Sequence, residues 1–309
     1  MSRARAVVFA YHDVGVRCLK VLLSGGVEVP LVVTVADDPH EQRWFESVAA
    51  TAADYGLPCI APASADDAAL IDEVRRLRPD FVFSFYYRAL LGAPLLGAAT
   101  RGALNMHGSL LPRFRGRAPT NWAILKGARE SGATLHYMVA RADAGDIVDQ
   151  QAVPILEDDD AREVYRKVTV AAEIVLARSL PALLEGRPPR RPQPLLPGEY
   201  FGRRRPEDGR IDWRCAAREI HDLVRAVAPP FPGAFAAVGG ERWDIHRTRL
   251  GGPTPPPGAG PRLFGRDGAV YAACGDGSVL RLLRAQRAGA ELDLAAAAAA
   301  LEKQPVTLA

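Results

Sequence analysis

The chain has 309 residues of which 48% are hydrophobic, so it can bury a large core, and its length favours two domains. Its 39 basic and 36 acidic residues leave a formal net charge of +3, which gives no overall field for nucleic acid or an anionic membrane surface. Its four cysteines are scattered and form no CxxC motif, which argues against a zinc site and a disulfide framework. No stretch approaches the roughly 18 apolar residues of a membrane span. We therefore expect a cytoplasmic protein without membrane insertion.

The first half of the chain alternates short apolar runs with segments of helical spacing. Runs rich in Val and Phe predict buried strands, and this βαβα order is typical of a doubly wound parallel sheet, as in Rossmann-like α/β domains. Strands are predicted at 6–10, 30–35, 80–85, 134–139 and 146–155, and helices at 41–55, 66–77 and 160–184.

The composition changes after the long helix. Residues 186–198 read GRPPRRPQPLLPG, which contains too much proline for a helix or a central strand and predicts a linker. The sequence thus divides into an N-terminal domain at 1–190 and a C-terminal domain at 200–309. Short strand-like pieces at 232–238, 242–250, 269–275 and 278–285, followed by a helix at 292–303, indicate that the second domain is small and β-rich.

The candidate chemistry begins with Asn105 and His107 in NMHGS. On an extended segment these two side chains share a face, and the end of a strand in an open α/β sheet is where ligands bind. A His beside an Asn donor can move a proton and stabilise an oxyanion in acyl transfer, provided that a carboxylate supports the His. Asp143 and Asp146 in the turn RADAGD offer one. From spacing alone, a structural polar pair and an ordinary Asp turn remain open.

Longer strings make the interpretation more specific. NMHGSLLPRFRGRAPTNWAI (105–124) followed by DAGDI (143–147) resembles the 10-formyltetrahydrofolate-dependent formyltransferases, and FGRRRPEDGRIDW (201–213) and VRAVAPPFPGAF (224–235) extend the resemblance over most of the chain. The resemblance implies a Rossmann-like catalytic domain followed by an OB-like C-terminal domain. It also implies 10-formyltetrahydrofolate as co-substrate and a catalytic triad of Asn105, His107 and Asp143.

The formyl acceptor is less well defined. Methionyl-tRNA formyltransferases look similar, but their motif typically reads RGAAP where this chain has RGRAP, with Arg117 at the variant position. They also tend to carry a basic insertion where this chain has VADDPHEQRWFESVAA. That segment has four acidic residues, Asp37, Asp38, Glu41 and Glu46, and a single basic one, Arg43. Such a surface repels phosphates, so we expect no nucleic-acid partner.

The strings VVFAYHDVG, FSFYYR and LHYMVARADAGDIV instead resemble the formyltransferase half of the bifunctional enzymes that make UDP-4-deoxy-4-formamido-L-arabinose for lipid A modification and polymyxin resistance. The resemblance implies transfer to UDP-4-amino-4-deoxy-L-arabinose. Methionyl-tRNA and other nucleotide-linked amino sugars remain alternatives. Because those enzymes continue into a UDP-glucuronic acid decarboxylase domain, we expect the decarboxylase here on a separate polypeptide that could associate with this one. A homo-oligomer is also open.

The resemblance also suggests binding residues. Folate would lie along the loop Val139, Ala140, Arg141, Ala142 and Asp143 and contact Arg117, Ser109, Ala89, Leu90 and Leu91. Weaker candidates for the UDP-sugar are Tyr11 and His12 after the first strand, and Arg203 and Arg204 in an arginine-rich segment that could equally be a solvated surface. We interpret His40, His136, His221 and His246 as structural, and the pair Tyr86 and Tyr87 as core and pocket wall.

Several other classes are disfavoured. No GxGxxG loop follows a strand, so we expect no NAD site, and the histidine spacing suggests no metal. A protein that only holds folate or a nucleotide sugar would not need Asn105, His107 and Asp143 together. A formyl-folate hydrolase would typically carry an N-terminal regulatory domain, whereas the run AVVFA opens the predicted catalytic domain at once.

Overall fold

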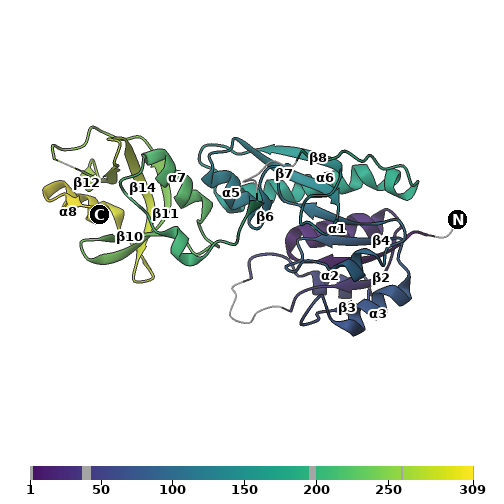
Figure 1. Cartoon of the computed structure of the whole chain (residues 1–309). Coiled ribbons are helices and arrows are strands. Elements are labelled where there is room, and N and C mark those ends of the chain that lie inside the picture. The colour runs from purple at the N-terminus through teal and green to yellow at the C-terminus, as the bar shows by residue number, and fades with distance from the viewer. Residues whose placement is uncertain (1–2, 37–42, 195–199, 259, 309) are drawn as a thin grey trace. The chain divides into compact units, whose positions relative to one another are not determined.

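The computed structural model describes residues 3–36, 43–194, 200–258 and 260–308 (Figure 1). Asp37, Asp38, His40 and Glu41 of the acidic segment, and 195–198 of the Pro-rich linker, lie outside the described residues. The chain divides into two compact units. The first comprises Met1–Pro119, Glu130–Val153 and Tyr165–Gly202, and the second comprises Thr120–Arg129, Pro154–Val164 and Arg203–Ala309.

The first unit is built on a seven-stranded sheet of order β3-β2-β1-β4-β5-β7-β8. Strands β1 to β5 pair in parallel. From β1 the chain adds β2 and β3 on one side and then β4 and β5 on the other, so the switch point, where α/β sheets bind ligands, lies between β1 and β4. The strands are β1 (Arg5–Ala10), β2 (Glu28–Val33), β3 (Cys59–Ile60), β4 (Phe81–Phe85), β5 (Gly102–His107), β7 (Glu130–Tyr137) and β8 (Ile147–Pro154).

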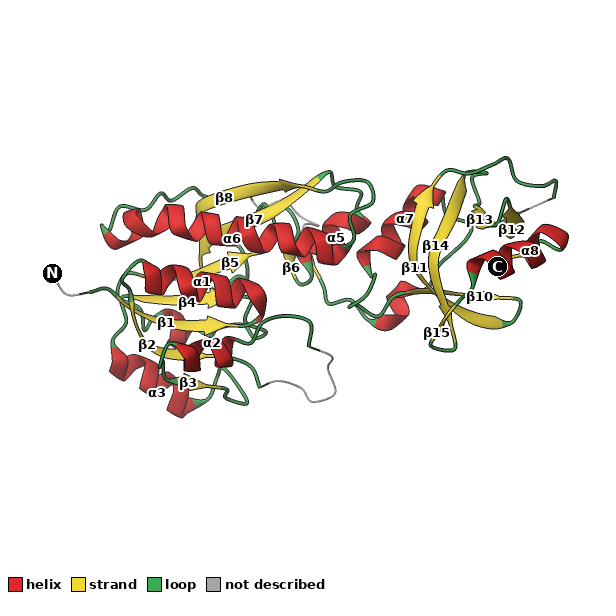
Figure 2. Ribbon diagram, turned by 180° about the vertical axis from the view of Figure 1, so that it is seen from behind, coloured by secondary structure: helices red, strands yellow, loops and turns green. Residues whose placement is uncertain are grey.

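Helices cover both faces of this sheet (Figure 2). One face packs Val7, Val33 and Val82 against α3 and α4. On the other face α1 and α6 lie side by side, joined by an ion pair of 2.7 Å between Arg17 and Glu173. The helices are α1 (His12–Ser24), α2 (Val48–Asp54), α3 (Ala68–Leu77), α4 (Ala93–Leu96) and α6 (Ala161–Leu184), whose first residues up to Val164 belong to the second unit. The helix α5 (Pro119–Leu125) belongs to the second unit from Thr120 onward.

Two expectations about this unit need correction. The sheet is mixed rather than all parallel, because β7 pairs with β5 in the antiparallel direction. Within the described part of the predicted helix at 41–55, which begins at residue 43, helix forms only at Val48–Asp54, where the Ser47 hydroxyl caps it by accepting the amide hydrogen of Ala50. The aromatic residues Trp44 and Phe45 precede that helix and contact other rings. Their apolar spacing reflects that packing rather than a helical face.

The second unit is a curved antiparallel sheet of order β10-β11-β14-β13-β12-β16 with β15 paired to β14. It closes around Trp213, which is 1% exposed, and the helices α7 and α8 complete its core. The expected α/β Rossmann-like domain and β-rich OB-like domain are thus confirmed. Its elements are β10 (Ala234–Val238), β11 (Glu241–Leu250), β12 (Arg262–Arg266), β13 (Ala269–Ala273), β14 (Val279–Arg287), β15 (Ala290–Glu291), β16 (Val306–Thr307), η1 (Pro206–Gly209), α7 (Ala217–Ala226) and α8 (Leu294–Lys303).

Two short strands outside these sheets, β6 (Arg115–Gly116) and β9 (Tyr200–Phe201), pair with each other in the first unit. Among the helices in the described part of the chain, none has both the length and the apolar character needed to cross a bilayer.

The Phe-rich strand β4 offers a test of the core. Phe83 is fully buried and stacks on Phe85 at 5.3 Å between ring centroids. We expect Phe83→Ala to lower the free energy of unfolding by about 3–5 kcal/mol, because it removes a buried ring and leaves a cavity. Val170→Ala on the exposed side of α6 is the control, with a change within about 0.5 kcal/mol. Urea unfolding followed by circular dichroism measures both, and equal effects would contradict this view of β4.

Candidate active site

Asn105 and His107 lie at the carboxyl end of β5 and point to the same face of the sheet. The ring of His107 is almost completely buried. Its Nε2 lies 3.0 Å from the carbonyl oxygen of Phe114, and because a carbonyl only accepts, Nε2 carries the hydrogen. In the neutral ring Nδ1 is then the basic nitrogen, and it faces Asp143 Oδ1 at 3.6 Å. His107 can therefore take up a proton beside a carboxylate.

Asp143 lies on the loop between β7 and β8, in a left-handed backbone conformation with φ of 52°. A non-glycine residue in this region is held there by its surroundings. Its Oδ2 accepts the amide hydrogen of Gly116 at 3.0 Å. Burial acts to raise the pKa of the Asp143 carboxyl, but the adjacent imidazoles of His107 and His136 and the Gly116 amide outweigh it and lower this pKa well below its ordinary value. The carboxylate is thus charged at neutral pH.

His136 is a fourth member of this cluster that sequence reasoning missed by treating it as structural. The antiparallel register sets His136 directly opposite Asn105. Its Nδ1 donates to the Tyr137 carbonyl at 2.9 Å, so Nε2 of the neutral ring accepts from Asn105 Nδ2 at 3.1 Å and lies 3.6 Å from Asp143 Oδ1. This contact fixes the orientation of the Asn105 amide. The one available signal was a polar residue inside the apolar run TLHYMV.

The loop after His107 is held by close contacts. Thr134 Oγ1 donates to the Ser109 carbonyl at 2.6 Å and accepts the amide hydrogen of Leu111 at 3.1 Å. A Cβ atom on Gly108 would lie 1.8 Å from the Tyr86 hydroxyl oxygen, so only glycine lets the backbone pass Tyr86 at this point. The loop therefore has little freedom to move His107.

The residues expected to bind folate occupy two neighbouring regions of the first unit. Arg117 is exposed and its Nη2 donates to the Arg88 carbonyl at 3.4 Å, which places it beside the segment Ala89, Leu90 and Leu91. Leu90 and Val139 are 72% and 47% exposed. Ser109 differs, because its hydroxyl is buried and donates to the Arg113 carbonyl at 2.6 Å. Ala140, Arg141 and Ala142 form the turn that leads to Asp143.

The weaker candidates fall in two separate places. Tyr11 and His12 lie at the carboxyl end of β1, where Tyr11 is the N-cap of α1 and His12 has a left-handed φ of 61°. The His12 ring packs on Phe45 at 3.8 Å between centroids, and burial, with a smaller contribution from Arg88, lowers its pKa to about 3. Arg203 and Arg204 belong to the second unit. There Arg204 is half-buried over the Trp122 ring.

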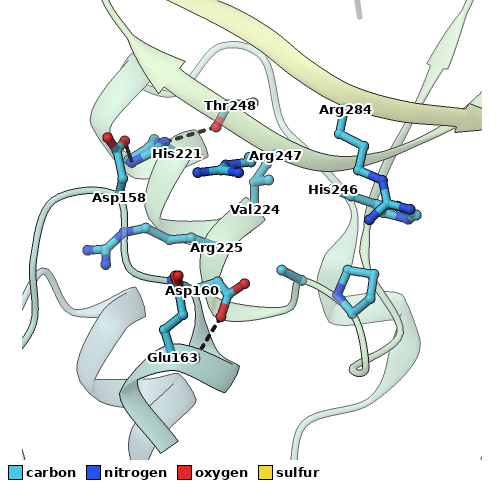
Figure 3. Close-up of a pocket in the computed structure, with 12 residues that line it drawn as sticks. Asp158, Asp160, Glu163, His221, Val224, Arg225, His246, Arg247, Thr248 and Arg284 are labelled. Atoms are coloured by element: carbon cyan, nitrogen blue, oxygen red, sulfur yellow. Dashed lines mark hydrogen bonds and ion pairs between the residues drawn. The ribbon is translucent and has the colours of Figure 1, made fainter. Parts of the chain in front are cut away.

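The second unit also contains a pocket of about 170 Å³ (Figure 3). It carries charges of both signs, most of which already have partners: Arg225 pairs with Asp222 at 2.8 Å, and His221 bonds Thr248 at 2.9 Å. None of the sequence-predicted site residues lines it. Within the described ranges, no three His, Cys, Asp or Glu side chains gather as the ligands of a metal ion would.

Comparisons with known proteins agree with this architecture. The family model described as formyl transferase matches residues 6–180, and the model of the formyl transferase C-terminal domain matches residues 204–299. The chain belongs to the formyl transferase family, and it is a formyltransferase with both domains of that family.

Solved structures of similar fold include sugar-modifying members. WlaRD, a sugar 3N-formyltransferase solved with dTDP and 5-N-formyl-THF, is 18% identical with a TM-score of 0.72, and the match covers 94% of this chain and 99% of that chain. An N-formyltransferase from Helicobacter canadensis, in complex with folinic acid and dTDP-3-aminofucose, is 19% identical with a TM-score of 0.70 over 93% and 100% of the two chains. Glycinamide ribonucleotide transformylase 1 from Symbiobacterium toebii is 24% identical with a TM-score of 0.53 over 64% and 92%.

The close passage of Gly108 beside Tyr86 can be tested directly. We expect Gly108→Ala to lower the free energy of unfolding by about 1–3 kcal/mol, because the new methyl group overlaps the Tyr86 hydroxyl. Adding Tyr86→Phe removes that oxygen and should restore part of the loss. Thermal unfolding of the two single variants and the double variant measures this coupling. Strictly additive effects would contradict the contact.

Proposed function

We propose that this protein transfers the formyl group of 10-formyltetrahydrofolate to the 4-amino group of UDP-4-amino-4-deoxy-L-arabinose, giving UDP-4-deoxy-4-formamido-L-arabinose for lipid A modification. The observation that carries this proposal is the convergence of Asn105, His107 and Asp143 at the carboxyl end of β5. WlaRD is described as a sugar 3N-formyltransferase, and the Helicobacter canadensis N-formyltransferase is in complex with dTDP-3-aminofucose, which supports a nucleotide-sugar acceptor.

In the proposed reaction 10-formyltetrahydrofolate supplies the formyl group, carried on N10. The neutral sugar amine attacks the formyl carbon, a new C–N bond forms, and the bond from that carbon to N10 breaks. Asn105 donates one amide hydrogen to His136, and its second hydrogen can stabilise the negative charge that develops on the formyl oxygen. His107 Nδ1 accepts the proton that the amine loses, and Asp143 stabilises the resulting imidazolium. His107 then returns this proton for delivery to N10.

The folate site is proposed on the exposed loop Val139, Ala140, Arg141, Ala142 and Asp143, with Arg117 and the segment 89–91. The exposed side chains of Leu90 and Val139 suit a flat ring system, and the Arg117 guanidinium suits a carboxylate. Ser109 contributes through its backbone in this view, because its hydroxyl already bonds within the loop.

For the nucleotide sugar we propose Tyr11 and His12, which lie at the switch point of the sheet, and Arg203 and Arg204 as partners for the pyrophosphate. Because its pKa is lowered to about 3, His12 would meet the substrate as a neutral ring. We further propose that the protein works in the cytoplasm, without nucleic acid or NAD, and that it associates with a separate decarboxylase or forms a homo-oligomer. Another nucleotide-linked amino sugar is the second candidate acceptor, favoured by the dTDP in the WlaRD structure and the dTDP-3-aminofucose in that of the Helicobacter canadensis enzyme.

His107 is the most direct test of the mechanism. We expect His107→Ala to lower kcat at least about 100-fold, since proton transfer and the ion pair with Asp143 are both lost. The thermal unfolding midpoint should stay close to that of the native protein. His246→Ala in the second unit is the matched control and should keep full activity. Near-native turnover by His107→Ala would show that the site lies elsewhere.

The acceptor is tested by offering UDP-4-amino-4-deoxy-L-arabinose, a dTDP-linked 3-amino sugar and methionyl-tRNA in parallel with 10-formyltetrahydrofolate. Release of tetrahydrofolate and the mass of the product report transfer. We expect kcat/KM for the UDP sugar to exceed that for the other two by at least about 100-fold. Preference for the dTDP sugar would overturn the arabinose assignment, and turnover with tRNA alone would overturn the whole class of acceptor.

A further inference from the structure

The segment that follows α6 returns to both loops of the site. Arg191 forms an antiparallel bridge with Ile147, through hydrogen bonds of 2.8 and 2.9 Å. Further on, β9 pairs with β6, and the Phe201 carbonyl accepts the amide hydrogen of Arg117 at 2.9 Å. All of these residues belong to the first unit. The segment therefore touches the loop that carries Asp143 and the loop that carries Gly116.

Gln193 makes the most specific of these contacts. Its Nε2 donates to the carbonyl oxygen of Gly145 at 2.6 Å and to that of Asp143 at 3.2 Å. Because both partners only accept, the orientation of the side-chain amide is fixed. The Oε1 atom is buried and has no hydrogen-bond partner in the described part of the chain. The two donated bonds are thus the polar contacts that the Gln193 amide makes here.

The loop that Gln193 holds is tightly constrained. Asp143 keeps its left-handed φ of 52°, and a Cβ on Gly145 would lie 2.0 Å from the Tyr137 carbonyl oxygen. The hydrogen bond from Gly116 to the Asp143 carboxylate joins this loop to the other one. On its far side Gly116 packs on Phe201, whose carbonyl oxygen lies 2.2 Å from where a Cβ on Gly116 would be. The same connecting segment thus supports both ends of the bond.

We propose that Gln193 is a positioning residue for formyl transfer: it holds the backbone of Asp143 so that the carboxylate stays between His107, His136 and the Gly116 amide. This inference rests on the proposed function of the triad. Gln193 acts through Asp143, because both of its hydrogen bonds go to backbone carbonyl oxygens of the loop that carries this carboxylate. The neutral amide supplies two hydrogen-bond donors to the two carbonyl oxygens. A carboxylate side chain at this position would be repelled by the same oxygens.

Gln193→Leu and Gln193→Met remove both donors while keeping a side chain of similar size. We expect kcat to fall about 10- to 100-fold while both KM values change by less than about threefold, because a displaced carboxylate affects the transition state rather than binding. Gln151→Leu is the matched control, since among the described residues the Gln151 amide bonds only the Ala152 carbonyl and Arg178. The control should keep native kcat.

The route through Asp143 is tested by a double-mutant cycle. In an Asp143→Ala background, Gln193→Leu should cost less than about threefold, because the group that it positions is gone. Equal losses in both backgrounds would overturn the proposal and leave a general structural role. An unchanged kcat in both Gln193 variants would overturn it as well. All rates are measured with whichever acceptor the native enzyme formylates.

A second measurement is independent of turnover. The amide group of Gly116 donates a hydrogen bond to the Asp143 carboxylate, so the rate at which this amide hydrogen exchanges with solvent reports the position of that carboxylate. By NMR, we expect Gln193→Leu and Gln193→Met to speed this exchange at least about tenfold, while Gln151→Leu leaves it unchanged. Unchanged exchange in both variants would overturn the inference even if kcat fell. A native enzyme that formylates no amino sugar would overturn the proposed function, while faster exchange would still support the positioning by Gln193.

Discussion

The candidate site depends on the register in which β7 pairs with β5. That antiparallel register sets Asn105 against His136 and His107 against Thr134, so each residue of the site on β5 meets a polar residue on β7. A shift by one residue would turn every one of these side chains to the opposite face of the sheet. Thr134 then holds the loop after His107 through the Ser109 carbonyl and the Leu111 amide. The pairing of β5 with β7 thus orients the side chains of both strands and the loop that follows His107.

The charge of Asp143 is tolerated because neighbouring groups compensate for its removal from water. A carboxylate in a largely buried position is costly unless it is hydrogen-bonded and lies near positive charge. The Gly116 amide provides a permanent donor, and the two imidazoles provide positive charge whenever either ring takes up a proton. The attraction between the Asp143 carboxylate and His107 is therefore strongest when His107 becomes an imidazolium. That is the step at which the proposed reaction needs this attraction.

Local sequence patterns predicted the elements whose structure depends mainly on residues that are close together in the chain. Short apolar runs gave β1, β2, β4 and the β-rich second domain, and the strings around Asn105, His107 and Asp143 predicted residues that the fold brings together. The direction of β7 was beyond such rules, because a buried strand has the same apolar pattern in either direction. His136 was missed for the same reason, since its role arises from the pairing partner and not from its neighbours in the chain. The aromatic residues Trp44 and Phe45 suggested a helix, but their packing partners are distant in sequence.

The pairing of β9 with β6 also affects how much of the chain the candidate site needs. A shortened chain that stopped at the end of α6 would keep every strand of the large sheet and all of the proposed catalytic side chains. It would nevertheless leave the backbone amides of Ile147 and Arg117 without the carbonyl partners that Arg191 and Phe201 provide. Unsatisfied backbone groups in a packed region are unfavourable. The smallest part of this protein that keeps both of these backbone pairings therefore extends through Phe201, well beyond the end of α6.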